Sequence, residues 1–309
     1  MQLAPELLAE LGPLALEARN AVEGMLAGLH RSTALGTGGE FVQYRAYMPG
    51  DDLKHIDWKL LARSGRVYTR VHRTDTEMRC AVLLDSSASM GYKGFHALAT
   101  KLHYAQTLAA SLAYLAKRQG DKAALFVSSG NLHRASRHGD STTFPRFIEQ
   151  LDGLQPTGSS DLPSAFTEAE SFLGHHRGMM IIISDLWDEH LPLVPLLRQA
   201  SFAKRDCLVL HVLDDDELAL PAIGPRRFID SETGEQITAA PESIRDSYRS
   251  RMTAHLDTLR QECLDNGASY HLLTTSTPYV QALTTSLSFE QTSAEPPYSP
   301  GALHYAPRA

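Results

Sequence analysis

The sequence has few cysteines: Cys80, Cys207 and Cys263 are the three among 309 residues. Their odd number and wide spacing exclude a disulfide framework and the paired spacings of zinc sites. Cys80 and Cys207 open apolar runs, in which a thiol behaves as a small hydrophobic side chain. We therefore expect buried thiols and a reducing compartment.

A basic excess and a long apolar run are also missing. Lys and Arg number 29 against 36 Asp and Glu, a net charge of −7, which argues against a general binder of nucleic acid or anionic membranes. No stretch approaches the ~20 apolar residues of a spanning helix. The N-terminal segment is interrupted by glutamates and has no basic start, unlike a signal peptide. We expect a soluble cytoplasmic protein with no membrane span.

The familiar signatures of phosphate and acyl chemistry are absent too. There is no G-x-x-x-x-G-K-[ST] loop and no G-x-S-x-G elbow. After the first buried apolar run, a phosphotransferase of the haloacid-dehalogenase type would carry D-x-D, but here Ser87 fills the third position.

What the sequence does contain is a regular alternation of apolar runs and amphipathic segments from residue 79 onward. Strands are expected at 79–85, 122–129, 178–186, 206–214 and 269–275, and helices at 95–120, 142–154, 161–174, 193–202, 242–267 and 279–287. A hairpin is expected at 226–240, around Thr233 and Gly234. Repeated β-α-β units predict an α/β fold with a doubly wound, mostly parallel sheet and a small N-terminal α+β extension.

Four parts are expected along the chain: an N-terminal helical segment (1–30), a small β/helix subdomain (31–78), the α/β domain (79–288) and a disordered tail (289–309). The tail is rich in Pro, Ser and Ala. The subdomain should contain strands at 41–47 and 66–74, with a short helix capped by Asp51 or Asp52 between them.

Three loops of the α/β domain are rich in side-chain oxygens. The first, "DSSASM" (85–90), offers Asp85, Ser87 and Ser89, which alternate and can point to one side. The second is "TGSSDL" (157–162) and the third is "SDLWDE" (184–189). Because ligands of such sheets bind beyond the carboxyl ends of the strands, we expect the loops to converge there.

Carboxylates and hydroxyls without His or Cys favour a hard cation, Mg²⁺ or Mn²⁺. Neutral hydroxyl ligands leave the ion electron-poor, so it can accept a carboxylate from another protein. The simpler alternative is that Asp85 caps a turn and the serines belong to ordinary loops.

The three loops resemble the metal-ion-dependent adhesion site of von Willebrand factor A domains, which has D-x-S-x-S, a threonine in a second loop and an aspartate after a later strand. The resemblance implies the metal ligands Asp85, Ser87, Ser89, Ser160 and Asp185. Ser160 stands where threonine is usual, Thr157 competes for that position, and Thr157 and Asp161 could form an additional site.

The upstream stretch "GEFVQYRAYMPGDDLKHIDWKLLAR" (39–63) is similar to the signature of the family called domain of unknown function fifty-eight, with Lys54 where arginine is more usual. Its polar and aromatic residues form either a structural network or a partner surface: Arg45, Asp51, Asp52, Asp57, Trp58 and Arg63. Members are often encoded beside MoxR-type AAA+ ATPases, which implies a partner or adaptor in a chaperone-like system.

The function predicted is a non-enzymatic, metal-dependent protein-interaction module. A magnesium-dependent hydrolase or phosphotransferase on a similar sheet is the alternative, and an α/β protein with a vestigial site is the third.

Overall fold

The structure is a computed structural model that describes residues 12–32, 44–46, 68–70, 78–128, 143–176, 178–188, 192–221 and 223–288. The chain divides into two compact units, one formed by residues 1–25 with 78–309 and the other by residues 26–77. The tail at 289–309 and the expected helix near Asp51 lie outside the described residues.

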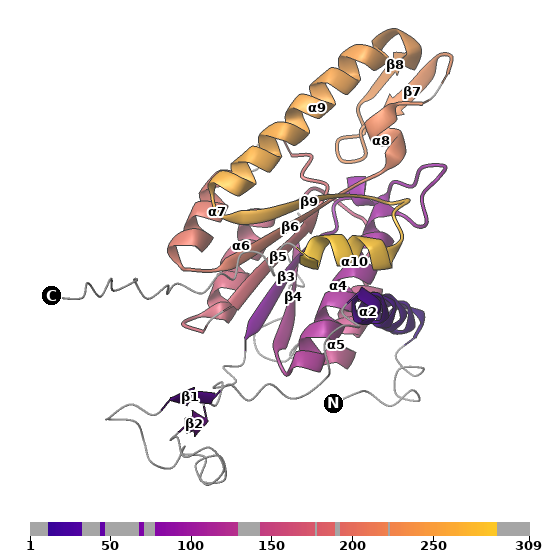
Figure 1. Ribbon diagram of the computed structural model, residues 1–309. Helices are drawn as coiled ribbons and strands as arrows, with labels where there is room; N and C mark the ends of the chain where they lie inside the picture. The colour runs from indigo at the N-terminus through magenta and orange to yellow at the C-terminus, as the bar shows by residue number, and fades with distance from the viewer. Residues whose placement is uncertain are drawn as a thin grey trace, which may run out of the picture. The chain divides into compact units, whose positions relative to one another are not determined.

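The larger unit is built on a five-stranded parallel sheet (Figure 1). Its strands are β3 (Arg79–Asp85), β4 (Lys122–Ser128), β5 (Gly178–Ser184), β6 (Asp206–Leu213) and β9 (Ala268–Thr274). They lie in the order β4-β3-β5-β6-β9, which is the 2-1-3-4-5 order of a doubly wound fold. The predicted fold class is confirmed, and the switch point of the sheet lies between β3 and β5.

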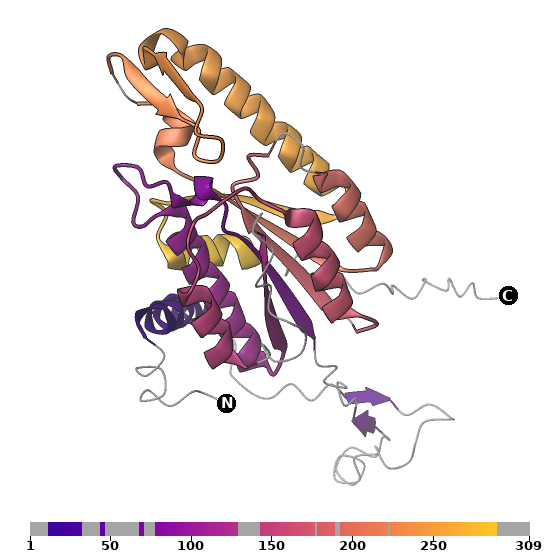
Figure 2. The same cartoon turned by 180° about the vertical axis from the view of Figure 1, so that it is seen from behind.

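Helices cover both faces of this sheet, as Figures 1 and 2 show. One face carries α4 (Lys101–Gln119), α5 (Phe144–Asp152) and α10 (Tyr279–Ser288). The other carries α6 (Leu162–Leu173), α7 (Leu193–Phe202) and α9 (Pro241–Asp265). Because both faces are covered, the strands are apolar almost throughout.

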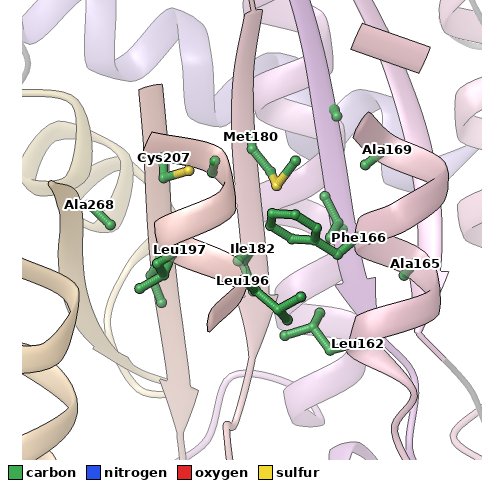
Figure 3. Packing of buried hydrophobic residues seen from close by; sticks show 14 of the residues in the cluster. Leu162, Ala165, Phe166, Ala169, Met180, Ile182, Leu196, Leu197, Cys207 and Ala268 are labelled. Carbon is green, nitrogen blue, oxygen red and sulfur yellow. The ribbon is translucent and has the colours of Figure 1, made fainter. Parts of the chain in front are cut away.

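The core between the sheet and α6 and α7 is drawn in Figure 3. Phe166 of α6 has no exposed surface and packs with Met180 and Ile182 of β5. Cys207 lies in the same cluster and Cys80 is also buried, as predicted for both thiols. None of the three cysteines, all of them among the described residues, forms a disulfide.

The helix expected at 95–120 begins at Lys101, six residues late. Thr100 caps it by accepting a hydrogen bond from the backbone N–H of His103, and Gly120 ends it with φ of 86°. The apolar spacing of 95–100 predicted helix wrongly, because the backbone N–H groups of Leu98 and Lys101 donate to the carbonyls of Thr275 and Tyr92 instead of to a preceding helical turn. Those of Gly94 and Phe95 are bonded to the carboxylates of Asp214 and Asp216.

The first described helix, α2 (Pro13–Ser32), begins at a proline, a residue that is favoured at the first position of a helix. Up to Met25 it belongs to the unit that contains the sheet. Its Glu23 accepts a 2.6 Å hydrogen bond from Arg118 of α4, and Glu17 accepts one from Thr107. This part of the segment therefore packs on the α/β domain.

In the smaller unit, β1 (Tyr44–Ala46) pairs antiparallel with β2 (Tyr68–Arg70). These are the central parts of the two expected strands, and Arg45 stands opposite Thr69. The remaining signature residues lie outside the described part: Asp51, Asp52, Asp57, Trp58 and Arg63.

The expected hairpin is confirmed as β7 (Arg226–Ile229) and β8 (Gln236–Ala239), paired antiparallel. Two short elements that the sequence did not reveal are η2 (Ala88–Gly91), a 3₁₀ helix inside the first loop, and α8 (Asp215–Ala219) after β6. None of the described helices combines the length and apolar character needed to cross a membrane.

Candidate functional site

The first and second predicted loops meet at the carboxyl edge of the sheet. The backbone N–H of Thr157 donates to the carbonyl of Ser86 over 2.9 Å, and that of Ala88 donates to the carbonyl of Gly158 over 2.8 Å. The N–H of Ser86 bonds to the carbonyl of Ser128 at the end of β4. Backbone bonds therefore hold the "DSSASM" and "TGSSDL" loops together.

Asp85 ends β3 and is 2 % exposed. One carboxylate oxygen accepts from the backbone N–H of Ser87 (2.9 Å) and the other from the hydroxyl of Ser184 (2.6 Å). Burial and the nearby charge of Asp185 raise the pKa of Asp85, although these hydrogen bonds act to lower it. Negative charge is therefore concentrated at a position shielded from water, where a bound cation would stabilise the ionised form of Asp85.

Ser87 and Ser89 bring their hydroxyl oxygens to 3.0 Å from each other, as the alternation of "DSSASM" predicted. Ligands at adjacent corners of an octahedron with bonds of 2.0–2.1 Å stand about 3 Å apart. The hydroxyl of Ser87 also bonds to the Asp85 carboxylate and lowers its pKa. The three side chains together can offer one face of a Mg²⁺ coordination shell.

Ser160 takes part in a different contact. Its hydroxyl lies 2.7 Å from that of Ser128, whose oxygen also accepts the backbone N–H of Asp161. Asp161 caps α6 through the N–H of Ser164, the structural role that its position predicts. Thr157 is exposed, and its backbone N–H donates to the carbonyl of Ser86. The contact with Ser128 connects Ser160 to the end of β4, and both Ser160 and Thr157 remain candidates for the threonine position.

Asp185 is buried and bound to a lysine that the sequence reasoning missed. The ammonium of Lys101, itself 1 % exposed, lies 2.8 Å from the Asp185 carboxylate and 2.7 Å from that of Glu217. Burial acts to lower the pKa of Lys101, but the two carboxylates outweigh it and raise this pKa. Lys101 is therefore a buried cation that compensates Asp185.

His211 of β6 contacts the backbone of the loop that contains Asp185. Its Nε2 lies 2.7 Å from the carbonyl of Asp185 and its Nδ1 lies 2.7 Å from the hydroxyl of Tyr270. Burial lowers the pKa of His211 to about 4, so the ring is neutral at pH 7. A carbonyl only accepts, so Nε2 carries the proton and both ring nitrogens are occupied.

A third buried carboxylate, that of Asp214, fixes the loop between η2 and α4. It accepts from the N–H of Gly94 (2.9 Å) and from the hydroxyl of Thr275 (2.7 Å). Its other oxygen caps α8 through Asp216, and Glu217 closes the capping box. No local sequence pattern predicts this loop anchor, because Gly94 and Asp214 are 120 residues apart in the chain.

This donor set fits a hard cation such as Mg²⁺ or Mn²⁺ better than a softer metal such as Zn²⁺ or Cu²⁺. It contains the carboxylate of Asp85, the carboxylate of Asp185, which shares Lys101 with Glu217, and two hydroxyls. In the part of the chain that the structure describes, no three His, Cys, Asp or Glu side chains converge as a ready metal cluster. An ion here would therefore depend on hydroxyls and water, as Mg²⁺ sites commonly do.

The family model described as "Protein of unknown function DUF58" matches residues 43–258. The chain belongs to the DUF58 family. The resemblance read from the upstream signature is thereby confirmed.

Among curated proteins, the DUF58 chain is similar to Rv1480 of Mycobacterium tuberculosis H37Rv and Mb1516 of Mycobacterium bovis, both described as uncharacterized. Each is 28 % identical over 258 residues, which cover 81 % of this chain and 79 % of the relative.

Solved structures with an overall likeness include BatB from Bacteroides thetaiotaomicron, at 17 % identity and a TM-score of 0.48, covering 70 % of this chain and 99 % of that one. The von Willebrand factor A domain of SpRpn10 is similar at 11 % identity and a TM-score of 0.40, covering 68 % and 96 %. The fold class itself rests on the sheet topology and strand order described above.

Proposed function

We propose that this DUF58 protein is a protein-interaction module whose carboxyl-edge site binds Mg²⁺ or Mn²⁺ and, through the ion, a carboxylate of a partner protein. The observation that carries the proposal is the pair of hydroxyls of Ser87 and Ser89, 3.0 Å apart beside the buried carboxylate of Asp85. Asp85, Ser87 and Ser89 would hold the ion directly.

Lys101 favours recognition of a carboxylate. Because Lys101 holds the Asp185 carboxylate in an ion pair, Asp85 would be the carboxylate in direct contact with the ion, and a divalent ion with one bound carboxylate keeps a net positive charge. We infer that Asp185 and Ser160 act on the ion through water, since their side chains are bonded to Lys101 and Ser128. An ion left positive in this way attracts a further carboxylate ligand.

The surroundings of the site suit a protein partner. Phe95 is 88 % exposed on the loop between Ser89 and Lys101, and Trp187 is 52 % exposed two residues after Asp185. Exposed aromatic side chains around a polar centre are typical of interaction surfaces. As the partner we propose a MoxR-type AAA+ ATPase, following the resemblance stated above, with the DUF58 protein as its adaptor.

The hydrolase or phosphotransferase alternative gains no support from a particular contact. His211 is the buried histidine nearest to Asp185 in the described network, and both its nitrogens are occupied. Its imidazole is therefore not available as a general base in this arrangement.

The test is capture of a MoxR-type ATPase from the same organism by the immobilised protein, with Mg²⁺ or with EDTA. Asp85→Asn should abolish capture as EDTA does. The matched control is Asp206→Asn, which removes an exposed carboxylate at the start of β6 and should leave capture unchanged. Capture that survives both EDTA and Asp85→Asn would contradict the proposed ion bridge.

A further inference from the structure

The turn of the β7–β8 hairpin carries an acidic residue toward the candidate ion site. In the projection of Figures 1 and 2 the connection between β7 and β8 lies next to the short helix η2. The carboxylate in question is that of Glu232, at the tip of this turn. Partial burial raises its pKa most, followed by the negative charges of Asp185 and Asp85 and then of Asp230 and Asp188.

The turn has a defined shape. One carboxylate oxygen of Asp230 accepts the backbone N–H groups of Glu232 (2.8 Å) and Thr233 (2.9 Å). Gly234 closes the turn with φ of 74° and donates its N–H to the carbonyl of Asp230. These bonds fix the backbone of Glu232 while its side chain stays exposed.

The elements that carry the hairpin are connected to the site. Arg245 and Arg249 of α9 donate to the carbonyls of Leu220 and Ala219 at the end of α8. Tyr248 donates to the carbonyl of Glu217 over 2.6 Å, and the Glu217 side chain binds Lys101. The base of the hairpin is therefore joined to the buried ion pair with Asp185.

We propose that Glu232 is an internal ligand of the candidate ion site, supplying from the hairpin turn a carboxylate that binds the cation in the position proposed for the partner's carboxylate. Without a cation, the turn holds the backbone of Glu232 in place, and the negative charges of Asp85 and Asp185 repel its carboxylate from the site. A bound divalent ion reverses the sign of this interaction and draws the side chain in. A partner then has to displace Glu232 from the ion, and this competition lowers the affinity of the protein for the partner's carboxylate.

This inference rests on the proposed ion site, so the experiment measures Mn²⁺ binding itself. Titration calorimetry gives the affinity for Mn²⁺, and water-proton relaxation gives the number of waters on the bound ion. Glu232→Gln should weaken Mn²⁺ binding about tenfold, or about 1.4 kcal/mol, and should add one water to the ion. Glu235→Gln, which removes the same charge from the same turn, is the matched control and should change neither value.

The outcomes separate the two ideas. If wild type and Asp85→Asn both fail to bind Mn²⁺, the ion site and the internal ligand are overturned together. If wild type binds Mn²⁺ and Glu232→Gln binds it with the same affinity and the same number of waters, the internal ligand is overturned and the ion site stands. An equal loss of affinity in Glu232→Gln and Glu235→Gln also overturns the internal ligand, because it shows a general charge effect.

Discussion

The ammonium of Lys101 lies 2.8 Å from the carboxylate of Asp185, and both side chains are almost completely buried. The lysine stands at the first position of α4 and the aspartate directly follows β5, so the contact joins two connections of the sheet that are 84 residues apart. It offsets part of the charge of Asp185, since Lys101 also binds Glu217, and leaves Asp85 as the carboxylate without a cationic side chain in the described network.

Replacing Lys101 with the isosteric methionine should strongly destabilise the fold. It leaves Asp185 buried without its cation, and breaking a buried pair in this way costs about 3–5 kcal/mol. Urea unfolding in EDTA measures the loss. The double variant Lys101→Met/Asp185→Asn should recover most of the stability, and Mn²⁺ should recover part of it in the single variant. An unchanged stability of Lys101→Met would show that the ion pair does not matter.

Asp85→Asn should raise the stability of the metal-free protein while abolishing ion binding. Burial and Asp185 raise the pKa of Asp85, so its ionised form destabilises the fold at any pH above that folded-state pKa. The cost disappears as the pH falls below the unfolded-state value. At pH 7 we expect the unfolding temperature in EDTA to rise by roughly 2–4 °C, the effect of about 1 kcal/mol. A lower unfolding temperature than wild type would contradict this reading of the site.

Gly94→Ala should destabilise the loop that precedes Lys101. A Cβ atom at Gly94 would lie 1.9 Å from a carboxylate oxygen of Asp214. The carboxylate would have to move, and the hydrogen bond that it accepts from the backbone N–H of residue 94 would be lost. We expect a loss of about 1–3 kcal/mol, as for other overpacked sites. Gly28→Ala is the control: its Cβ meets no atom within 4 Å, and alanine should favour helix α2. Denaturant unfolding of both variants tests the difference.

The three cysteines should resist thiol reagents in the native protein. All are buried, and burial raises the pKa of Cys207 and of Cys263 to about 12. At pH 8 on the order of one such thiol in ten thousand is the reactive thiolate. A disulfide reagent such as Ellman's should therefore detect three thiols after unfolding and almost none before. Rapid reaction of a native thiol would show that the packing around it opens readily.

Local sequence determined the fold class and the position of the site. The apolar runs at 79–85 and 178–184 are continuous because their strands are covered on both faces, and that pattern requires no knowledge of partners. The same strands end in Asp85 and Ser184, so the parallel topology alone brings their loops to one edge. Asp161 as a helix cap and the hairpin around Gly234 were likewise predictable, because a few neighbouring residues fix them.

Only the tertiary structure decided what these groups contact. Lys101 was part of an amphipathic pattern that continued back to residue 95, and its burial depends on carboxylates from two other connections. Helix spacing could not reveal that Asp214 and Asp216 would take the backbone N–H groups of Gly94 and Phe95. The charge at the site and the position of Glu232 depend on contacts between segments that are distant in the sequence. Such contacts stabilise the protein only after the chain between them has folded into a closed loop.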